Sequence, residues 1–154
     1  MNNVLFNEKL ARFHVRADSA RQAICLGSRM LLEAGDVKGE FERRVLEREV
    51  LFPTGLDVQP VGVAIPHTDS IYVNHSQMAF VSLRRPVEFR YMADKDRIVR
   101  VGMVFVLAMA HSHEQVDTLS ALMGLFAREE TVSELYECAS SVELAALLQR
   151  NGIS

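Results

Sequence analysis

Pro66 and His67 end a short apolar segment, Gly62–Ile65, and their position along the chain points directly to chemistry. The segment predicts a brief buried strand, and Pro66 ends it because proline has no backbone N–H to give to a sheet. The imidazole of His67 is therefore expected at a strand end, where α/β proteins place their active sites. A neutral imidazole is a good nucleophile near pH 7. A turn histidine without a role is the alternative that this dipeptide alone leaves open.

A second group of chemically capable side chains follows the long apolar segment Val99–Met109. If that segment is a strand parallel to Gly62–Ile65, the loop after it leaves the sheet at the same edge as His67. The polar residues at this edge could ligate zinc or iron in a metal-dependent hydrolase. They are His67, Asp69, His111, His113 and Glu114. No His-Glu-x-x-His or Cys-x-x-Cys pattern supports that alternative, and loop residues without a role are the simpler interpretation of His111 and His113.

Short strands and helices interleave along the chain, which predicts one α/β domain over residues 1–154 with a mixed sheet covered on both faces. Further strands are expected at Arg12–Arg16, at Met78–Leu83 before an Arg84-Arg85-Pro86 turn, and at Val99–Met109. Helices are expected from Asp18 or Ser19 to Leu32, then over Lys38–Leu51, Glu114–Arg128, Thr131–Ala139 and Ser141–Arg150. Gly35 and Ser140 are placed to cap helix ends.

Composition narrows the class of protein. A chain of 154 residues that is 49% hydrophobic can bury roughly two thirds of its unfolded surface. The net charge is −3 and no basic run exceeds two residues, so no nucleic-acid partner is expected. Cys25 and Cys138 lie among apolar neighbours, which predicts buried thiols in a reducing compartment. The polar N-terminus and the lack of about 20 consecutive apolar residues predict a soluble, cytoplasmic protein without membrane insertion.

Three segments together resemble the signature of mannitol/fructose-type IIA domains of the bacterial phosphoenolpyruvate-dependent sugar phosphotransferase system. They are Arg48-Glu49, Phe52–Gly55 and Gly62–His67. The resemblance continues through Ser82–Phe89, the Val99 strand and the Val116–Phe126 segment, and it covers about Phe13–Leu148. The Phe-Pro-Thr-Gly segment is most similar to the galactitol-type subgroup. The fold that this resemblance implies is a three-layer α/β/α arrangement.

The resemblance implies that His67 is the nucleophile of a phosphotransferase. It would accept a phosphoryl group from the histidine phosphocarrier protein and pass it to the cysteine of a cognate IIB component. The membrane IIC component would then take up a carbohydrate such as a galactitol-like polyol, and no metal or organic cofactor is implied. A neutral ring nitrogen can attack phosphorus without a general base, so catalysis depends on positioning and charge stabilisation. A regulatory protein that binds partners according to its phosphorylation state is the alternative within the same family.

Several side chains are candidates to support His67. Arg48 could bind phosphoryl oxygens in a bidentate manner, although a solvated helix charge is equally compatible with the sequence. Thr54 and Thr68 could donate hydroxyl hydrogen bonds or simply form turns. Many family members carry a second histidine at the position of Gln115, and His113, or less favourably His111, could replace it. Asp69 could hold the imidazole tautomer, but a negative charge beside a phosphoryl acceptor is unhelpful.

Overall fold

The computed structural model describes residues 6–153, apart from the side chains of Asn7 and Glu8. The ends of the predicted 1–154 domain and most of the polar N-terminus therefore lie outside the described residues. Within them, one mixed sheet has the strand order β1-β4-β2-β3-β5, and β4 also pairs with β5. The strands are β1 (Phe6–Val15), β2 (Gly55–Leu56), β3 (Gly62–Ala64), β4 (Gln77–Tyr91) and β5 (Asp94–Ala108).

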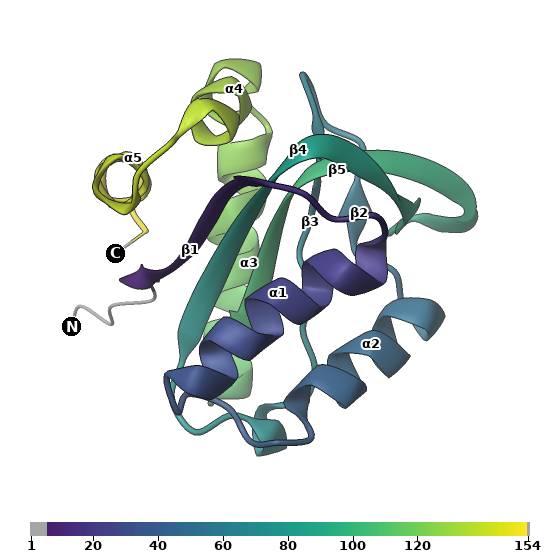
Figure 1. Cartoon of the computed structure of the whole chain (residues 1–154), viewed down its shortest axis with the longest axis vertical. Helices are drawn as coiled ribbons and strands as arrows, with labels where there is room; N and C mark the ends of the chain where they lie inside the picture. The colour runs from purple at the N-terminus through teal and green to yellow at the C-terminus, as the bar shows by residue number, and fades with distance from the viewer. Residues whose placement is uncertain (1–5, 154) are drawn as a thin grey trace.

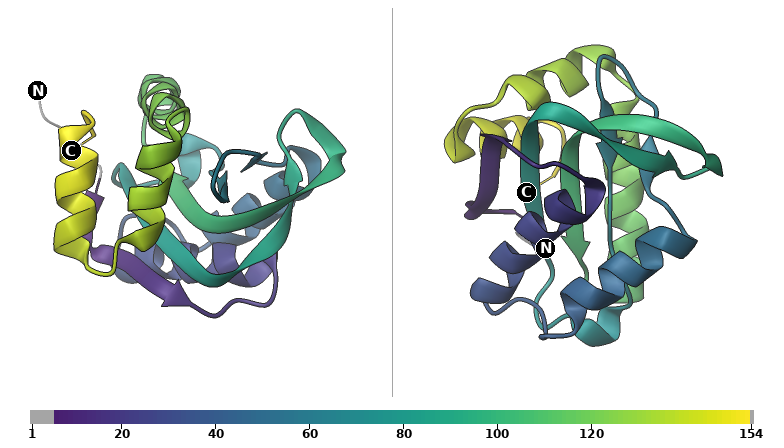
Figure 2. Two further views of the ribbon diagram at one scale, coloured as in Figure 1. Left: turned by 90° about the horizontal axis from the view of Figure 1, so that it is seen from above. Right: turned by 45° about the vertical axis from the view of Figure 1, so that its right-hand side comes forward.

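Helices cover both faces of the sheet, which confirms the predicted three-layer architecture (Figures 1 and 2). One face is covered by α1 (Ala20–Glu33) and α2 (Phe41–Leu51). The other face is covered by α3 (Ser112–Phe126), α4 (Glu129–Glu137) and α5 (Ser141–Arg150). Among the described helices, none combines the length and the apolar character that crossing a membrane requires.

Each face of the sheet has its own apolar core, because successive side chains of a strand point to opposite sides. On the α3 side, the ring of Phe105 lies 5.0 Å from the ring of Phe80 and 5.3 Å from that of Phe126, measured between centroids. On the α1 side, Val104 packs in one cluster with Phe41, and both are fully buried. The near-continuous apolar segment Val99–Met109, which forms the second part of β5 up to Ala108, is therefore buried on both faces of the sheet, as predicted.

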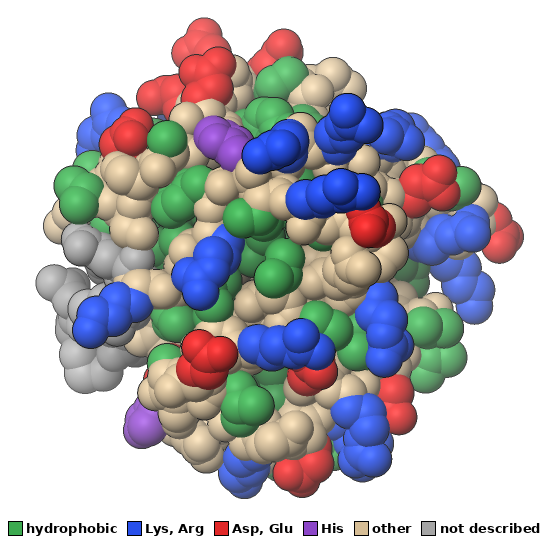
Figure 3. Space-filling model, in the orientation of Figure 1, with side chains coloured by type: hydrophobic (Ala, Val, Ile, Leu, Met, Phe, Trp, Pro, Cys, Tyr) green, Lys and Arg blue, Asp and Glu red, His purple; other side chains and the backbone are tan. Residues whose placement is uncertain are grey.

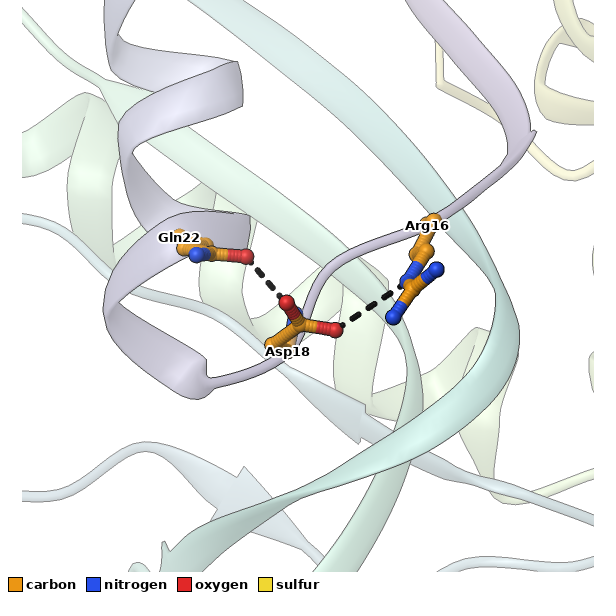
Figure 4. Close-up of polar contacts among 3 residues, drawn as sticks. All are labelled: Arg16, Asp18 and Gln22. Atoms are coloured by element: carbon orange, nitrogen blue, oxygen red, sulfur yellow. Dashed lines mark hydrogen bonds and ion pairs between the residues drawn. The ribbon is translucent and has the colours of Figure 1, made fainter.

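The start of α1 is held by local hydrogen bonds that the sequence partly predicts. The Ser19 hydroxyl accepts from the backbone N–H of Gln22 at 3.2 Å, as an N-cap does. In the other direction, the Gln22 side chain accepts from the backbone N–H of Asp18 at 2.7 Å, and Arg16 donates to the Asp18 carboxylate at 3.2 Å (Figure 4). At the far end, Gly35 adopts a φ of +79°, the left-handed conformation expected of a glycine that ends a helix.

The turn predicted at Arg84-Arg85-Pro86 is wrong, because β4 continues through it to Tyr91. The β4–β5 register breaks between Ser82 and Val87, and a proline without an N–H is tolerated at such an irregularity. Arg84 and Arg85 are exposed there, and Lys and Arg side chains gather over the part of the surface where β4 and β5 run (Figure 3).

Beyond this irregularity, the sequence of β4 has the alternation of apolar and polar residues that is typical of a strand. Buried Val87 and Phe89 alternate with exposed Glu88 and Arg90, the period of a strand with one wet face. The result is a long antiparallel β4–β5 hairpin whose turn at Met92 projects from the body of the sheet (Figure 1).

Other differences from the predictions are smaller. β1 begins at Phe6 rather than Arg12, α2 begins at Phe41 rather than Lys38, and the short β2 was not predicted. Both cysteines are free thiols, but Cys25 is only half-buried, because it lies at the edge of the face that α1 turns toward the sheet.

Two glycines allow the strands around the site to approach one another closely. A Cβ atom at Gly62 would lie 2.4 Å from the Arg100 carbonyl oxygen, and one at Gly55 would lie 2.5 Å from the Arg90 carbonyl oxygen. Both obstacles are backbone atoms that belong to the hairpin, so they cannot swing aside. The sheet therefore requires glycine at both positions.

We expect Gly62→Ala to lower the free energy of unfolding by about 1–3 kcal/mol, because the added methyl group forces β3 away from β5. Urea unfolding followed by circular dichroism measures this change. Gly124→Ala is the control: it lies in α3 with open space around the new Cβ, and it should stabilise by about 0.5–1 kcal/mol. A Gly62→Ala variant as stable as the unmodified protein would contradict the close-approach argument.

Candidate functional site

His67 lies directly beyond the end of β3, as the sequence predicts. Every residue of β3 is buried, and the backbone stays against β5 after Pro66: the Leu107 N–H donates to the Pro66 carbonyl at 2.9 Å. His67 itself forms a parallel bridge with Leu107. Since β3 and β5 are parallel, the segment after β5 also leaves the sheet at this edge.

The imidazole ring of His67 is buried and held in one tautomer. His67 is only 7% exposed, and the Nδ1 atom of its ring lies 2.7 Å from the Ile65 carbonyl oxygen. Because a carbonyl oxygen can only accept, Nδ1 must carry the hydrogen in this contact. Nε2 then keeps its lone pair, which makes it the nucleophilic atom of the ring.

The surroundings also keep this ring neutral. Burial lowers the pKa of His67 below its usual value of 6.5, and the positive charge of Arg48 lowers it further. The hydrogen bond to Ile65 and the carboxylate of Asp69 act in the opposite direction but are outweighed as a whole. At neutral pH the ring is therefore uncharged, and Nε2 is available for attack.

A cleft of about 470 Å³ opens beside His67, and we call it the His67 cleft. Its walls come from the end of α2, the segment before β2, the turn of the β4–β5 hairpin and α3. The lining residues are Arg48, Leu51, Phe52, Pro53, Thr54, His67, Met92, Ala93, Asp94, Lys95 and Leu119. Most of these side chains are apolar, and the cleft has two cations against one carboxylate. The cleft therefore suits an anionic group delivered by an apolar surface.

Arg48 is the cation that the sequence predicted to support His67, and both residues line this cleft. It lies in the last turn of α2, with its guanidinium carbon 5.2 Å from the centre of the Phe52 ring. Its Nε atom is buried without a hydrogen-bond partner, and among the described residues no carboxylate forms an ion pair with it. A half-buried guanidinium with a free donor beside a nucleophilic ring is suited to bind phosphoryl oxygens.

Thr54 has a different partner from the one the sequence suggested. Its hydroxyl donates to Glu49 Oε1 at 2.8 Å, and its backbone N–H donates to Glu49 Oε2, also at 2.8 Å. A threonine hydroxyl has one hydrogen, so in this structure it is not free to donate to a phosphoryl oxygen. The structure thus shows a contact of Thr54 with Glu49 at the wall of the cleft, and a hydrogen bond from Thr54 to a phosphoryl oxygen stays a prediction.

Glu49 is the residue of the site to which sequence reasoning gave no role. Burial raises its pKa to about 7, although the two hydrogen bonds from Thr54 and the charge of Arg48 pull the value down. The one available signal was its position directly after Arg48 in the motif. Its partner five residues on, beyond the end of the helix, cannot be read from sequence.

The segment just after His67 adds little to the geometry of the site. Thr68 is buried next to it, and no hydrogen bond of its hydroxyl is seen among the described residues. Asp69 is exposed and precedes the short 3₁₀-helix Ser70–Tyr72. It is the weakest of the four influences on the pKa of His67. The tautomer is held by the Ile65 carbonyl rather than by Asp69.

His111 and His113 lie at the start of α3, on the edge of the sheet where they were expected. His111 is the N-cap residue of the helix, and the two rings stack with their centroids 5.7 Å apart. Both are exposed and neither lines the His67 cleft, to which α3 contributes Leu119. Gln115 is half-buried in the same first turn. The replacement of the second family histidine by His113 or His111 stays a prediction.

The metal-hydrolase alternative finds no support in the part of the chain that the structure describes. No group of three or more His, Cys, Asp or Glu side chains there is arranged to hold a metal ion. The paired rings of His111 and His113 are two ligands at most, and His67 points its Nδ1 atom at a backbone carbonyl.

The family model described as "Phosphoenolpyruvate-dependent sugar phosphotransferase system, EIIA 2" matches residues 4–151. The galactitol-specific EIIA component of the phosphotransferase system of Escherichia coli strain K12 is 29% identical over 110 residues. The match spans 71% of this chain and 72% of that protein.

Solved structures show the same fold at lower identity. IIA mannitol of Escherichia coli, in complex with phosphorylated IIB mannitol, is 24% identical with a TM-score of 0.73, covering 95% of this chain and 99% of that one. The nitrogen regulatory protein IIA-Ntr of Neisseria meningitidis is 23% identical with a TM-score of 0.72, covering 94% and 96%. These similarities confirm the expected mannitol/fructose-type IIA fold.

We expect the pKa of His67, followed by NMR titration of its ring, to lie below 6.5, because burial penalises the charged imidazolium. Folding then contributes stability that is present above pH 6.5 and is lost as the pH falls through this lowered pKa. A midpoint at or above 6.5 would show that the ring is not desolvated as described.

Proposed function

The chain belongs to the EIIA 2 family of the phosphoenolpyruvate-dependent sugar phosphotransferase system, and on that premise we propose that it carries a phosphoryl group on His67. The observation that supports this most is the fixed ring of His67. Nδ1 is held by the Ile65 carbonyl, so Nε2 is the free nucleophile, in a cleft that also contains the unpaired guanidinium of Arg48. This pair performs the two tasks that phosphoryl transfer needs, attack and charge stabilisation.

The proposed donor is the phosphohistidine of the histidine phosphocarrier protein. The Nε2 lone pair of His67 attacks phosphorus, the donor's P–N bond breaks, and its electron pair stays on the donor ring. The hydrogen on Nδ1 remains in its bond to the Ile65 carbonyl throughout. Arg48 offsets the negative charge that the phosphoryl oxygens bring into the cleft. No metal or organic cofactor takes part in this step.

The proposed acceptor is the cysteine thiolate of a cognate IIB component. Sulfur attacks phosphorus, an S–P bond forms, and the N–P electron pair returns to Nε2 of His67. The solved complex of IIA mannitol with phosphorylated IIB mannitol of Escherichia coli, which has this fold, supports a IIB partner. The same cleft serves donor and acceptor in turn, so both must leave readily.

We further propose that the chain acts in the cytoplasm for a membrane IIC component that transports a galactitol-like polyol. The galactitol-specific relative in Escherichia coli supports this substrate class. A regulatory IIA protein is the second candidate, since the nitrogen regulatory protein IIA-Ntr has the same fold. Genes for IIB and IIC components next to the gene of this chain would favour transport over regulation.

The transfer itself is tested by incubating the protein with phosphoenolpyruvate, enzyme I and the histidine phosphocarrier protein, and then measuring intact mass. We expect the protein to gain one acid-labile phosphoryl group. His67→Ala should gain none, whereas the control His75→Gln, at an exposed histidine outside the His67 cleft, should gain one. No gain in the unmodified protein, or an equal gain in His67→Ala, would refute the proposal.

The role of Arg48 is tested by the rate of the same reaction. Arg48→Gln should slow phosphorylation by about 100-fold, the usual effect of removing one charge-stabilising group from a transition state. Arg43→Gln removes an exposed arginine from the same helix and should leave the rate unchanged. If the two variants react at the same rate, Arg48 is only a surface charge.

A further inference from the structure

The half-buried carboxylate of Glu49 has no task in the transfer described above. It follows Arg48 in the sequence but does not line the His67 cleft, so it does not touch a phosphoryl group there. It lines a neighbouring surface depression with Arg21 and Arg90. Removing a carboxylate from water costs free energy unless the carboxylate accepts hydrogen bonds in the protein.

Both oxygens of Glu49 bind the same residue. Thr54 donates its backbone N–H to Oε2 and its hydroxyl hydrogen to Oε1, each at 2.8 Å. These two bonds fix the position and rotation of Thr54 relative to the end of α2. Thr54 is itself 3% exposed, so water cannot replace either bond at low cost.

From Thr54 the contacts continue to the ring of His67. The Thr54 carbonyl accepts from the backbone N–H of Ile65 at 3.4 Å, and the Ile65 carbonyl accepts from His67 Nδ1 at 2.7 Å. The first of these bonds is long and therefore weak, so a small shift of Thr54 would break it. Four hydrogen bonds thus connect Glu49 to the ring of His67 by way of Thr54 and Ile65.

We infer that Glu49 is a positioning residue for phosphoryl transfer: by clamping Thr54 it orients the Ile65 carbonyl that keeps His67 Nδ1 protonated and Nε2 free. The role in transfer rests on the proposed function, whereas the hold on the ring does not. A loosened carbonyl would let the ring rotate or change tautomer, and a small misplacement of a nucleophile costs much of its rate.

The geometry predicts which substitutions keep the clamp. Glutamine at position 49 has the same length: its Oε1 can accept the Thr54 N–H, and its Nε2 can donate to the Thr54 hydroxyl. Aspartate is one methylene too short to reach both donors, and alanine reaches neither. The clamp therefore requires two polar atoms at the right distance, and not a charge.

The first readout uses no phosphoryl donor. In protein labelled with ¹⁵N at histidine, the ring nitrogens of His67 report its tautomer at a pH where the ring is neutral. We expect the Nδ1–H tautomer in the unmodified protein and in Glu49→Gln, and a mixture of tautomers in Glu49→Ala and Glu49→Asp. Glu47→Ala, an exposed glutamate on the same helix, is the matched control and should keep the Nδ1–H tautomer.

The second readout is the rate of phosphorylation by the histidine phosphocarrier protein. Glu49→Ala should react about 100-fold more slowly than the unmodified protein, and Glu49→Asp should be slowed in the same direction. Glu49→Gln and Glu47→Ala should react at close to the unmodified rate. Circular dichroism establishes that each variant is folded, and should Glu49→Ala not fold, Glu49→Asp against Glu49→Gln decides the question.

The outcomes separate this inference from the proposed function. If the unmodified protein is not phosphorylated, the proposed function fails, and the tautomer still tests the clamp. If phosphorylation occurs but folded Glu49→Ala or Glu49→Asp keeps both the Nδ1–H tautomer and the full rate, Glu49 does not position His67. A Glu49→Gln variant as impaired as Glu49→Ala would also overturn the inference, because charge rather than position would then be needed.

Discussion

The hydrogen bond between His67 Nδ1 and the Ile65 carbonyl is the contact on which the rest of the site depends. It links a side chain to a backbone group two residues earlier, where the chain runs on beside β5 beyond the end of β3. Pro66 lies at that point, and its carbonyl is tied to Leu107 of β5. The bond fixes the tautomer of the ring, because Nδ1 carries the hydrogen, and it leaves Nε2 with the free lone pair.

Burial and charge around this bond come from segments that are distant in sequence. The end of α2 supplies Arg48, the β4–β5 hairpin supplies one wall of the cleft at its turn, and α3 supplies another. His67 itself is held beside these walls by β3, which lies close against β5 because position 62 is a glycine. The same burial that lowers the pKa of His67 raises that of Glu49, since each group disfavours its charged form when water is removed. Loss of water thus keeps the ring of His67 neutral and makes the hydrogen bonds of Glu49 to Thr54 more important.

Local sequence signals predicted the helices and strands that carry the site. Features that depend on pairing between distant segments were not predicted. Pro66 predicted the strand end, Ser140 predicted the start of α5, and the apolar Val99–Met109 segment predicted the buried part of β5. In contrast, β4 crosses Pro86 because its pairing with β5 shifts register there, and a shift of register leaves no mark on one strand alone. The two-residue β2 is likewise defined by its neighbours rather than by its own composition.

The candidate site divides in the same way. Pairing His67 with Arg48 required only the motif, and the structure places both in one cleft. The bond from Thr54 to Glu49 depends on how the chain leaves α2, so sequence could suggest a hydroxyl near the site but not its partner. The stacking of His111 on His113 is also a product of the backbone at the start of α3.

The central claim is that Nε2 of His67 bears the phosphoryl group while Nδ1 keeps its hydrogen. It is tested most directly by ¹⁵N NMR of the protein labelled at histidine, after phosphorylation by the histidine phosphocarrier protein. The account predicts coupling between phosphorus and Nε2 of His67, with Nδ1 still protonated. Coupling to Nδ1, or to a nitrogen of another histidine, would contradict it.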